Sequence, residues 1–340
     1  MAYRYLGNKT MLADWIVGII SDNVAAGAVV ADPMCGTAAI SEALAIKGFK
    51  VVAADALYFP VIHASSRLLI KKEPPFEEFG GYKRVLETLN GLKPKTGFFY
   101  KEFGADGRPV NRDSPRMYFS GENAGKIDAI REFIRQEYDE GKLTDLEHVA
   151  LLQNLLLAVN AVANISGTYG YFLSSLSKGA QKPIHLSPLT FFDTPATHRV
   201  LHGPVSITAP LLQSDAVYLD PPYTKRQYAG NYHILETIAR EDEPDAVGDG
   251  GLRPWKEDAS AFCYRKRAGA ALKDALSKLD TRDVFLSYSE DGQMAPDEVL
   301  EILSAYGDVR LYQHEYARYR SNAGASSGCI YEQLYHVRME

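Results

Sequence analysis

The 340-residue sequence predicts an α/β protein, in which a mainly parallel sheet is interrupted by a long helical insertion. Three observations predict this class. A strand, a helix and a second strand follow one another in residues 29–54, and this order implies parallel strands joined by a right-handed crossover. Residues 60–200 are rich in helical patterns and too long for a simple connection, so they predict a subdomain. Short apolar strands return after residue 200.

The first elements follow from hydrophobic spacing. Apolar residues three or four positions apart predict an amphipathic helix, and short apolar runs that end at an acid or a proline predict buried strands. In order, the predicted elements are a helix at Thr10–Asn23, a strand at Val29–Ala31, a helix at Ala38–Lys47 and a strand at Lys50–Ala54.

The insertion is mostly helical. Helices are predicted at Ile62–Lys72, Asn123–Glu140 and Thr144–Ile165, and the third opens with a capping-box pattern, Thr144 to Glu147. Residues 73–115 are rich in glycine, proline and charge, and no firm assignment is made there.

The C-terminal part returns to the sheet. Strands are predicted at Val205–Thr208, Ala216–Leu219, Val284–Ser287, Val309–His314 and Glu332–Arg338. Helices are predicted at Ile234–Arg240, Ala268–Leu279 and Pro296–Tyr306, with loops at Asp242–Gly251 and Ser321–Gly328.

Composition predicts an ordinary globular protein, with 46% hydrophobic and 24% charged residues. No apolar run is long enough to span a membrane and no secretory signal opens the chain, so we expect a cytoplasmic location. The three cysteines fit no metal pattern, which favours a reducing compartment. The net charge of −6 argues weakly against a nucleic-acid partner, although basic residues gather locally.

Asp220-Pro221-Pro222-Tyr223 is the most informative motif. It follows the apolar run 216–219, and two prolines cannot continue a strand because they lack N–H groups. The motif therefore places a carboxylate, a stiff turn and an aromatic ring at the carboxyl end of a strand, where open α/β sheets bind ligands. Such a turn suits a flat substrate that carries an amine, such as a nucleobase. A plain proline-rich loop is the alternative.

Asp32-Pro33-Met34-Cys35-Gly36-Thr37 forms the first strand-to-helix turn. Gly36 allows a ligand to approach the backbone, and the following helix start offers free N–H groups. The turn is neither a phosphate loop nor a dinucleotide fingerprint. Asp55 ends the next strand, where an acid can accept hydrogen bonds from ribose hydroxyls. Together these residues indicate an adenosine-containing cofactor without a pyrophosphate; a plain tight turn is the alternative.

Lys9 stands at the start of the first predicted helix, where the helix dipole disfavours a cation. The turn Tyr5-Leu6-Gly7 precedes it. A cation in such a place often has a partner, for example a ligand carboxylate or a phosphate. A solvated lysine is the alternative.

These motifs occur in an order that resembles the DNA adenine-N6 methyltransferases of the alpha group, the Dam-like (D12) family. Tyr-x-Gly-x-Lys at 5–9 precedes Asp-Pro-x-x-Gly-Thr at 32–37, then the helical insertion, then Asp-Pro-Pro-Tyr at 220–223. Residues 118–131, 163–170 and 226–233 are also similar to this family. The resemblance covers nearly the whole chain. One departure is Pro204-Val205-Ser206-Ile207, where relatives often carry an acid that faces the cofactor's adenine.

The resemblance implies a Rossmann-like fold that depends on S-adenosylmethionine (SAM). Residues 1–60 and 200–340 would form the SAM-binding catalytic domain, and residues 61–199 the target-recognition insertion. The implied reaction is methyl transfer to N6 of a flipped adenine in double-stranded DNA, without a metal. The implied setting is a restriction–modification system in a bacterial or phage-infected cell, near the nucleoid, with a cognate endonuclease as a candidate partner. A solitary phage or bacterial enzyme is the alternative.

The family's site residues carry over by motif. The implied catalytic residues are Asp220, Pro221, Pro222 and Tyr223. The implied cofactor residues are Tyr5, Gly7, Lys9, Asp32, Pro33, Cys35, Gly36, Thr37, Asp55 and Asp220. The implied substrate residues are Tyr223, Lys225, Arg226, Tyr228, Asn231, Tyr232, Arg318 and Arg320.

Further DNA contacts are expected from a set of basic residues, namely Lys178, Lys182, Arg265, Lys266 and Arg267. For any one of them taken alone, solvated surface charge is the alternative and the stronger interpretation. Residues 80–114 are a candidate base-reading loop, and residues 241–267 are a second. Two alternative functions stay open. One is methylation of an rRNA base, and the other is a catalytically silent module that binds SAM or DNA.

Overall fold

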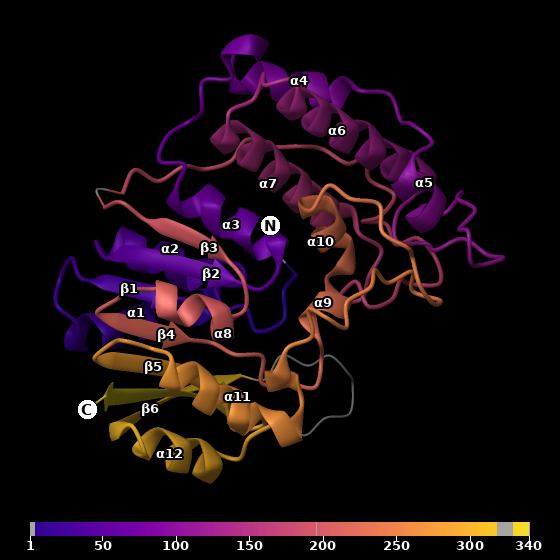
Figure 1. Cartoon of the computed structure of the whole chain (residues 1–340). Helices are drawn as coiled ribbons and strands as arrows, with labels where there is room; N and C mark the ends of the chain where they lie inside the picture. Colours follow the sequence, from indigo (N-terminus) through magenta and orange to yellow (C-terminus); the bar gives the residue numbers. More distant parts are fainter. Residues whose placement is uncertain (1–3, 195, 318–328, 340) are drawn as a thin grey trace. The chain divides into compact units, whose positions relative to one another are not determined.

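The structure, a computed structural model, describes residues 4–194, 196–317 and 329–339. The chain divides into two compact units, each described by itself. We call residues 9–56, 194–227 and 260–340 the sheet unit, and residues 1–8, 57–193 and 228–259 the helical unit. Figure 1 labels the elements of both.

The sheet unit is built on one mixed sheet. Its strand order in the described residues is β3-β2-β1-β4-β5-β7-β6. The strands are β1 (Val29–Asp32), β2 (Lys50–Asp55), β3 (Arg199–His202), β4 (Ala216–Leu219), β5 (Asp283–Ser289), β6 (Gly307–Ala317) and β7 (Cys329–Met339). The strands β3, β2, β1, β4 and β5 are parallel, and β7 is antiparallel to both β5 and β6. This confirms the expected Rossmann-like α/β class.

Helices cover the sheet. The helices α11 (Arg265–Ser277) and α12 (Pro296–Ser304) lie along one face (Figure 1), where Leu272 and Val299 share a core with Val217 of β4 and Val284 of β5. The remaining elements of the unit are η1 (Thr10–Leu12), α1 (Ala13–Asn23), α2 (Ala39–Ile46), α8 (Val205–Thr208), η3 (Ala209–Leu211) and η4 (Ala261–Cys263). Every residue of the central strands β4 and β5 is buried, which explains the apolar runs at 216–219 and 284–286.

The helical unit has its own core. Its elements are α3 (Tyr58–Leu68), η2 (Glu77–Phe79), α4 (Tyr82–Gly91), α5 (Phe98–Phe103), α6 (Gly121–Asp139), α7 (Asp145–Val162), α9 (Tyr228–Asn231) and α10 (His233–Ala239). Helix α7 is buried nearly all round, and its predicted capping box is confirmed by reciprocal hydrogen bonds between Thr144 and Glu147. In the described ranges, no helix combines the length and apolar character needed to cross a bilayer.

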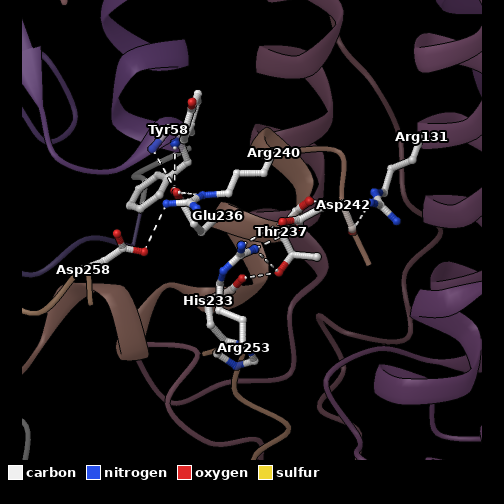
Figure 2. A network of polar contacts seen from close by, with 10 residues as sticks. Tyr58, Arg131, His233, Glu236, Thr237, Arg240, Asp242, Arg253 and Asp258 are labelled. Carbon is white, nitrogen blue, oxygen red and sulfur yellow. Dashed lines mark hydrogen bonds and ion pairs between the residues drawn. The ribbon is translucent and has the colours of Figure 1, made fainter. Parts of the chain in front are cut away.

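A network of polar contacts ties residues 228–259 into the helical unit (Figure 2). Glu236 of α10 accepts hydrogen bonds from the backbone N–H of Tyr58, at 3.1 Å, and from Arg240 Nε, at 2.6 Å. Arg253 binds both carboxylate oxygens of Asp242, at 3.0 and 2.8 Å. Buried charges of this kind need partners, so the network fixes where α10 packs.

The predicted domain bounds and the compact units differ mainly at residues 1–8 and 228–259, both of which belong to the helical unit. The sequence assigned residues 228–259 to the catalytic domain, whereas they pack with the helices of residues 57–193. The reason is the burial of α10, all seven residues of which are buried.

One element was predicted wrongly. Residues 205–208 form helix α8 and not a strand. The carbonyl of Pro204 accepts hydrogen bonds from the N–H groups of Ile207, at 2.8 Å, and Thr208, at 3.0 Å. Proline at a helix start needs no N–H partner, and this outweighs the strand preference of Val-x-Ile-Thr. The strand that pairs with β2 is β3, at Arg199–His202.

Candidate active site

Three carboxylates lie at one edge of the sheet. Asp32 ends β1, Asp55 ends β2, and Asp220 directly follows β4. Strand β1 pairs in parallel with both β2 and β4, so the carboxyl ends of all three strands share an edge. This edge is where doubly wound sheets bind ligands.

The turn after β1 is locked to the end of β2. Gly36 adopts φ +51°, and its N–H donates to Oδ2 of Asp55 at 3.0 Å. The N–H of Cys35 donates to the carbonyl of Ala54, also at 3.0 Å. The left-handed backbone explains the glycine. The predicted turn, Asp32 to Thr37, and Asp55 are therefore brought together.

Asp32 has one carboxylate oxygen without a partner. Its Oδ2 accepts a hydrogen bond from Ser41 Oγ at 2.6 Å, while Oδ1 is buried and has no hydrogen-bond partner in the described chain. Burial raises the pKa of Asp32 to about 7. The hydrogen bond from Ser41 lowers this pKa, whereas the negative charges of Asp220 and Asp55 raise it. An unsatisfied buried oxygen is costly, so a ligand cation or donor at this position would be favoured.

Lys9 is buried between two carboxylates. Its side chain is 5% exposed, and Nζ lies 3.3 Å from Asp220 Oδ1 and 2.6 Å from Glu332 Oε1. The ammonium also lies 5.1 Å from the ring centre of Tyr223. The partners of this predicted cofactor residue are thus carboxylates of the protein itself.

Glu332 is a residue of the site that the sequence reasoning missed. It stands on β7, is 2% exposed, and accepts hydrogen bonds from Lys9 and from Ser287 Oγ at 2.8 Å. The available signal was a glutamate within the predicted terminal strand, close to the apolar residues Leu334 and Val337, because glutamate is rarely buried unless it is paired.

The pKa values of this group depend on one another. Burial raises the pKa of Asp220 to about 7, Lys9 opposes that rise, and Glu332 adds to it. Burial lowers the pKa of Lys9, but the charges of Asp220, Tyr223 and Glu332 outweigh it and the pKa is raised well above the usual value. Lys9 is therefore a cation, whereas Asp220 titrates near neutral pH.

The Pro-Pro turn fixes Tyr223. Pro221 is buried, and Pro222 and Tyr223 are partly exposed. The ring of Tyr223 packs edge-on against Tyr288 with centres 6.0 Å apart, and its carbonyl accepts a hydrogen bond from Gln293 N–H at 2.9 Å. The aromatic face is thus held by both side-chain and backbone contacts.

Two basic segments of the sheet unit are tied together. Gln227 and Ser260 exchange hydrogen bonds at 2.9 and 2.8 Å, and Cys263 Sγ donates to the carbonyl of Arg226. These hydrogen bonds connect two exposed segments, 225–226 and 264–267. We call the exposed residues of both segments the basic patch, and its members are Lys225, Arg226, Tyr264, Arg265, Lys266 and Arg267.

Three predicted substrate residues, Tyr228, Asn231 and Tyr232, belong to the helical unit, as does the predicted cofactor residue Tyr5. Tyr5 stacks on Tyr232 at 4.9 Å in the helical unit, and the Tyr232 oxygen, fully buried, accepts a hydrogen bond from the N–H of Leu6. In the same unit Tyr228 donates to the Leu6 carbonyl, and Asn231 accepts from Thr168. These contacts give Tyr228, Asn231 and Tyr232 packing roles within the helical unit.

The remaining predictions concern single residues. Gly7 belongs to the helical unit with φ +70°, and Lys178 and Lys182 are exposed there. Arg318 and Arg320, with the loop predicted at 321–328, lie outside the described residues. Within the described ranges, no group of three or more His, Cys, Asp or Glu residues could hold a metal ion.

Known methyltransferases are similar to this chain. The type II methyltransferase M.FokI of Planomicrobium okeanokoites is 31% identical over 343 residues, which cover 99% of this chain and 53% of M.FokI. M.NlaIII of Neisseria lactamica is 31% identical, covering 94% of this chain and 93% of that protein. M.CviAII of Paramecium bursaria Chlorella virus 1 is 27% identical, covering 99% and 98%. The chain spans about half the length of the first curated relatives it matches.

A sequence model of one protein family matches most of the chain. Residues 5–294 match the D12 class N6 adenine-specific DNA methyltransferases, and this range includes every described site residue above except Glu332. The match confirms the resemblance drawn from the order of the motifs. The chain therefore belongs to the D12 class of N6 adenine-specific DNA methyltransferases.

Proposed function

We propose that this chain transfers a methyl group from SAM to the exocyclic N6 amine of adenine in double-stranded DNA. The observation that carries the proposal is the carboxylate of Asp220, held by a rigid Pro-Pro turn beside the Asp32–Gly36 turn and Asp55. Family membership supports the same reaction. The relatives are named type II methyltransferases, which supports a restriction–modification setting and a cognate endonuclease as partner.

The residues at this edge fit SAM. The unpartnered Oδ1 of Asp32 suits the cationic amino group of the methionine part. The Asp55 carboxylate, already oriented by the Gly36 N–H, suits the ribose hydroxyls. When bound, SAM supplies an electrophilic methyl group.

Asp220 and Pro221 would act on the adenine amine. That amine is a poor nucleophile because its lone pair is delocalised into the ring. The two N–H groups of the amine would donate hydrogen bonds to the Asp220 carboxylate and the Pro221 carbonyl. These hydrogen bonds favour a pyramidal nitrogen and stabilise its developing positive charge. As the N–CH₃ bond forms and the methyl–sulfur bond breaks, the nitrogen loses one proton. Asp220, with a pKa raised to about 7, is a suitable acceptor for it.

Base flipping would bring the adenine to this edge. Leaving the duplex costs a few kcal/mol, which stacking on an aromatic ring offsets in part. Tyr223 offers such a ring, fixed against Tyr288. The basic patch would hold the phosphates near the turn, and the helical unit is the proposed target-recognition part.

A single variant tests the assignment. We expect Asp220→Ala to lose transfer from labelled SAM to duplex DNA, because it removes the acceptor of the amine proton. Its SAM affinity, measured by calorimetry, should change little, since Asp32 and Asp55 remain. Asp274→Ala, an exposed acid on α11, is the matched control. Transfer at the wild-type rate by Asp220→Ala would remove the assigned role.

Two alternatives are separated by the same assay. In a competition between duplex DNA and ribosomal RNA, preferential labelling of the RNA would favour an rRNA base methyltransferase. Binding of SAM and DNA without any labelled product would favour a silent binding module.

A further inference from the structure

The Lys9 cluster holds more negative charge than a buried lysine needs. We define this cluster as Lys9, Asp220 and Glu332. One ammonium faces two carboxylates, at 3.3 Å and 2.6 Å. A single carboxylate would already neutralise Lys9, and a second buried one adds a desolvation cost. The surplus charge lies beside the group assigned to the adenine amine.

We propose that Glu332 is a positioning residue for methyl transfer, because it holds the Lys9 ammonium against Asp220 and keeps the cluster negatively charged. This inference rests on the proposed function. Glu332 acts through Lys9 and Asp220 and not by touching the substrate.

Strand pairing fixes Glu332 in place. It lies on β7 opposite Ser289 of β5 and His314 of β6, so its backbone is held on both sides. Its Oε1 receives hydrogen bonds from Ser287 Oγ, at 2.8 Å, and from Lys9 Nζ. The ion pair of Lys9 with Glu332, at 2.6 Å, is shorter than its ion pair with Asp220, at 3.3 Å, so Glu332 limits the movement of the ammonium.

This arrangement orients Asp220. Lys9 Nζ lies 3.3 Å from Oδ1 of Asp220, so the ammonium lies by one of the two carboxylate oxygens. One oxygen is therefore anchored and the other is left to accept a hydrogen bond from the amine. The net negative charge of the cluster complements the positive charge that develops on that nitrogen.

Among the described residues, the ionisable groups that interact with Asp220 are Lys9, Glu332 on β7, Asp32 on β1 and the phenol of Tyr218. The phenol of Tyr223 interacts with Lys9. The charge of Glu332 raises the pKa of Asp220. Since Asp220 must be ionised to accept the amine proton, activity should fall as pH decreases through its pKa. Removal of the Glu332 charge should move that decline to lower pH.

The test uses the full chain with duplex DNA and SAM. Glu332→Gln keeps the shape and removes the charge, so we expect kcat to fall on the order of tenfold. The KM for DNA and the affinity for SAM should stay within about twofold, and the acid limb of the pH–rate profile should shift to lower pH. The matched control is Glu315→Gln, an exposed glutamate on neighbouring β6, which should behave as wild type.

A second variant keeps the test decisive if Glu332→Gln does not fold. Glu332→Asp keeps the charge but withdraws the carboxylate by one methylene, so kcat should fall while the acid limb stays at the wild-type pH. The inference is overturned if either folded variant keeps wild-type kcat, or if Glu332→Gln loses only thermal stability with an unmoved acid limb. Absence of transfer by the wild-type chain would instead count against the proposed function.

Discussion

Replacement of Lys9 by methionine should destabilise the sheet unit strongly, with a characteristic pH dependence. Methionine keeps most of the apolar stem of lysine and removes the ammonium. The change leaves Asp220 and Glu332 without their shared cation. Glu332 is 2% exposed and Asp220 17% exposed, so water can compensate little of the loss at Glu332.

The distances give the size of the effect. At an effective dielectric constant of about 20, unit charges 3.3 Å and 2.6 Å apart attract by about 5 and about 6 kcal/mol. Desolvation of the three groups cancels a large part of this attraction. Breaking a buried ion pair by removing one partner costs about 3–5 kcal/mol, and we expect Lys9→Met to fall in that range at pH 8.

The loss should shrink on acidification. Without Lys9, which lowers the pKa of Asp220, that pKa should rise further above its unfolded value. A carboxyl whose folded pKa lies above its unfolded pKa binds protons more readily when folded, so stability increases as pH falls. The difference from wild type should therefore be smaller at pH 5.5 than at pH 8.

Urea unfolding at both pH values measures this. Lys278→Met is the matched control, because Lys278 forms an exposed ion pair with Asp274 at 2.8 Å. Surface pairs contribute about 0–1 kcal/mol, so the control should change little at either pH. A loss below about 1 kcal/mol for Lys9→Met, or a loss that is equal at pH 5.5 and pH 8, would refute the reasoning.

Two further predictions concern neighbouring residues. Asp32→Asn should stabilise the folded chain by about 1–3 kcal/mol at pH 8, because the raised pKa of Asp32 makes its ionised form unfavourable there, and the gain should vanish near pH 4. Urea unfolding measures this gain in stability, and the affinity for SAM should fall in the same variant. An equal gain at both pH values would contradict the proposed cause. Lys225→Ala with Arg226→Ala should reduce the slope of log affinity for duplex DNA against log salt by about 2. The matched control is Lys47→Ala with Lys50→Ala, two exposed lysines near the amino end of β2, and an unchanged slope in the first variant would remove the phosphate role.

Local chemistry made much of the sheet predictable. Asp32, Asp55 and Asp220 each follow a short apolar strand, and a parallel arrangement brings strand ends to one edge. The structure adds a hydrogen bond from the Gly36 N–H to Asp55, which the sequence did not predict. Such inferences succeed because turn residues and strand ends are set by a few neighbours in sequence.

Long-range pairing was not predictable in the same way. Lys9 and Glu332 are 323 positions apart, and a lysine before a helix does not specify which carboxylate it meets. The packing of residues 228–259 with the helical unit likewise depends on Glu236, which reaches the backbone of Tyr58, 178 positions away. Helix α8 shows the complementary limit, because Pro204 overrode the strand preference of residues 205–208.

Identification of the methylated atom tests the central claim most directly. The full chain is incubated with duplex DNA and isotope-labelled SAM, the DNA is digested to nucleosides, and the labelled nucleoside is identified by mass spectrometry. We expect N6-methyladenine from the wild-type chain and none from Asp220→Ala. A label on cytosine, on another atom of adenine, or on no base at all would contradict it.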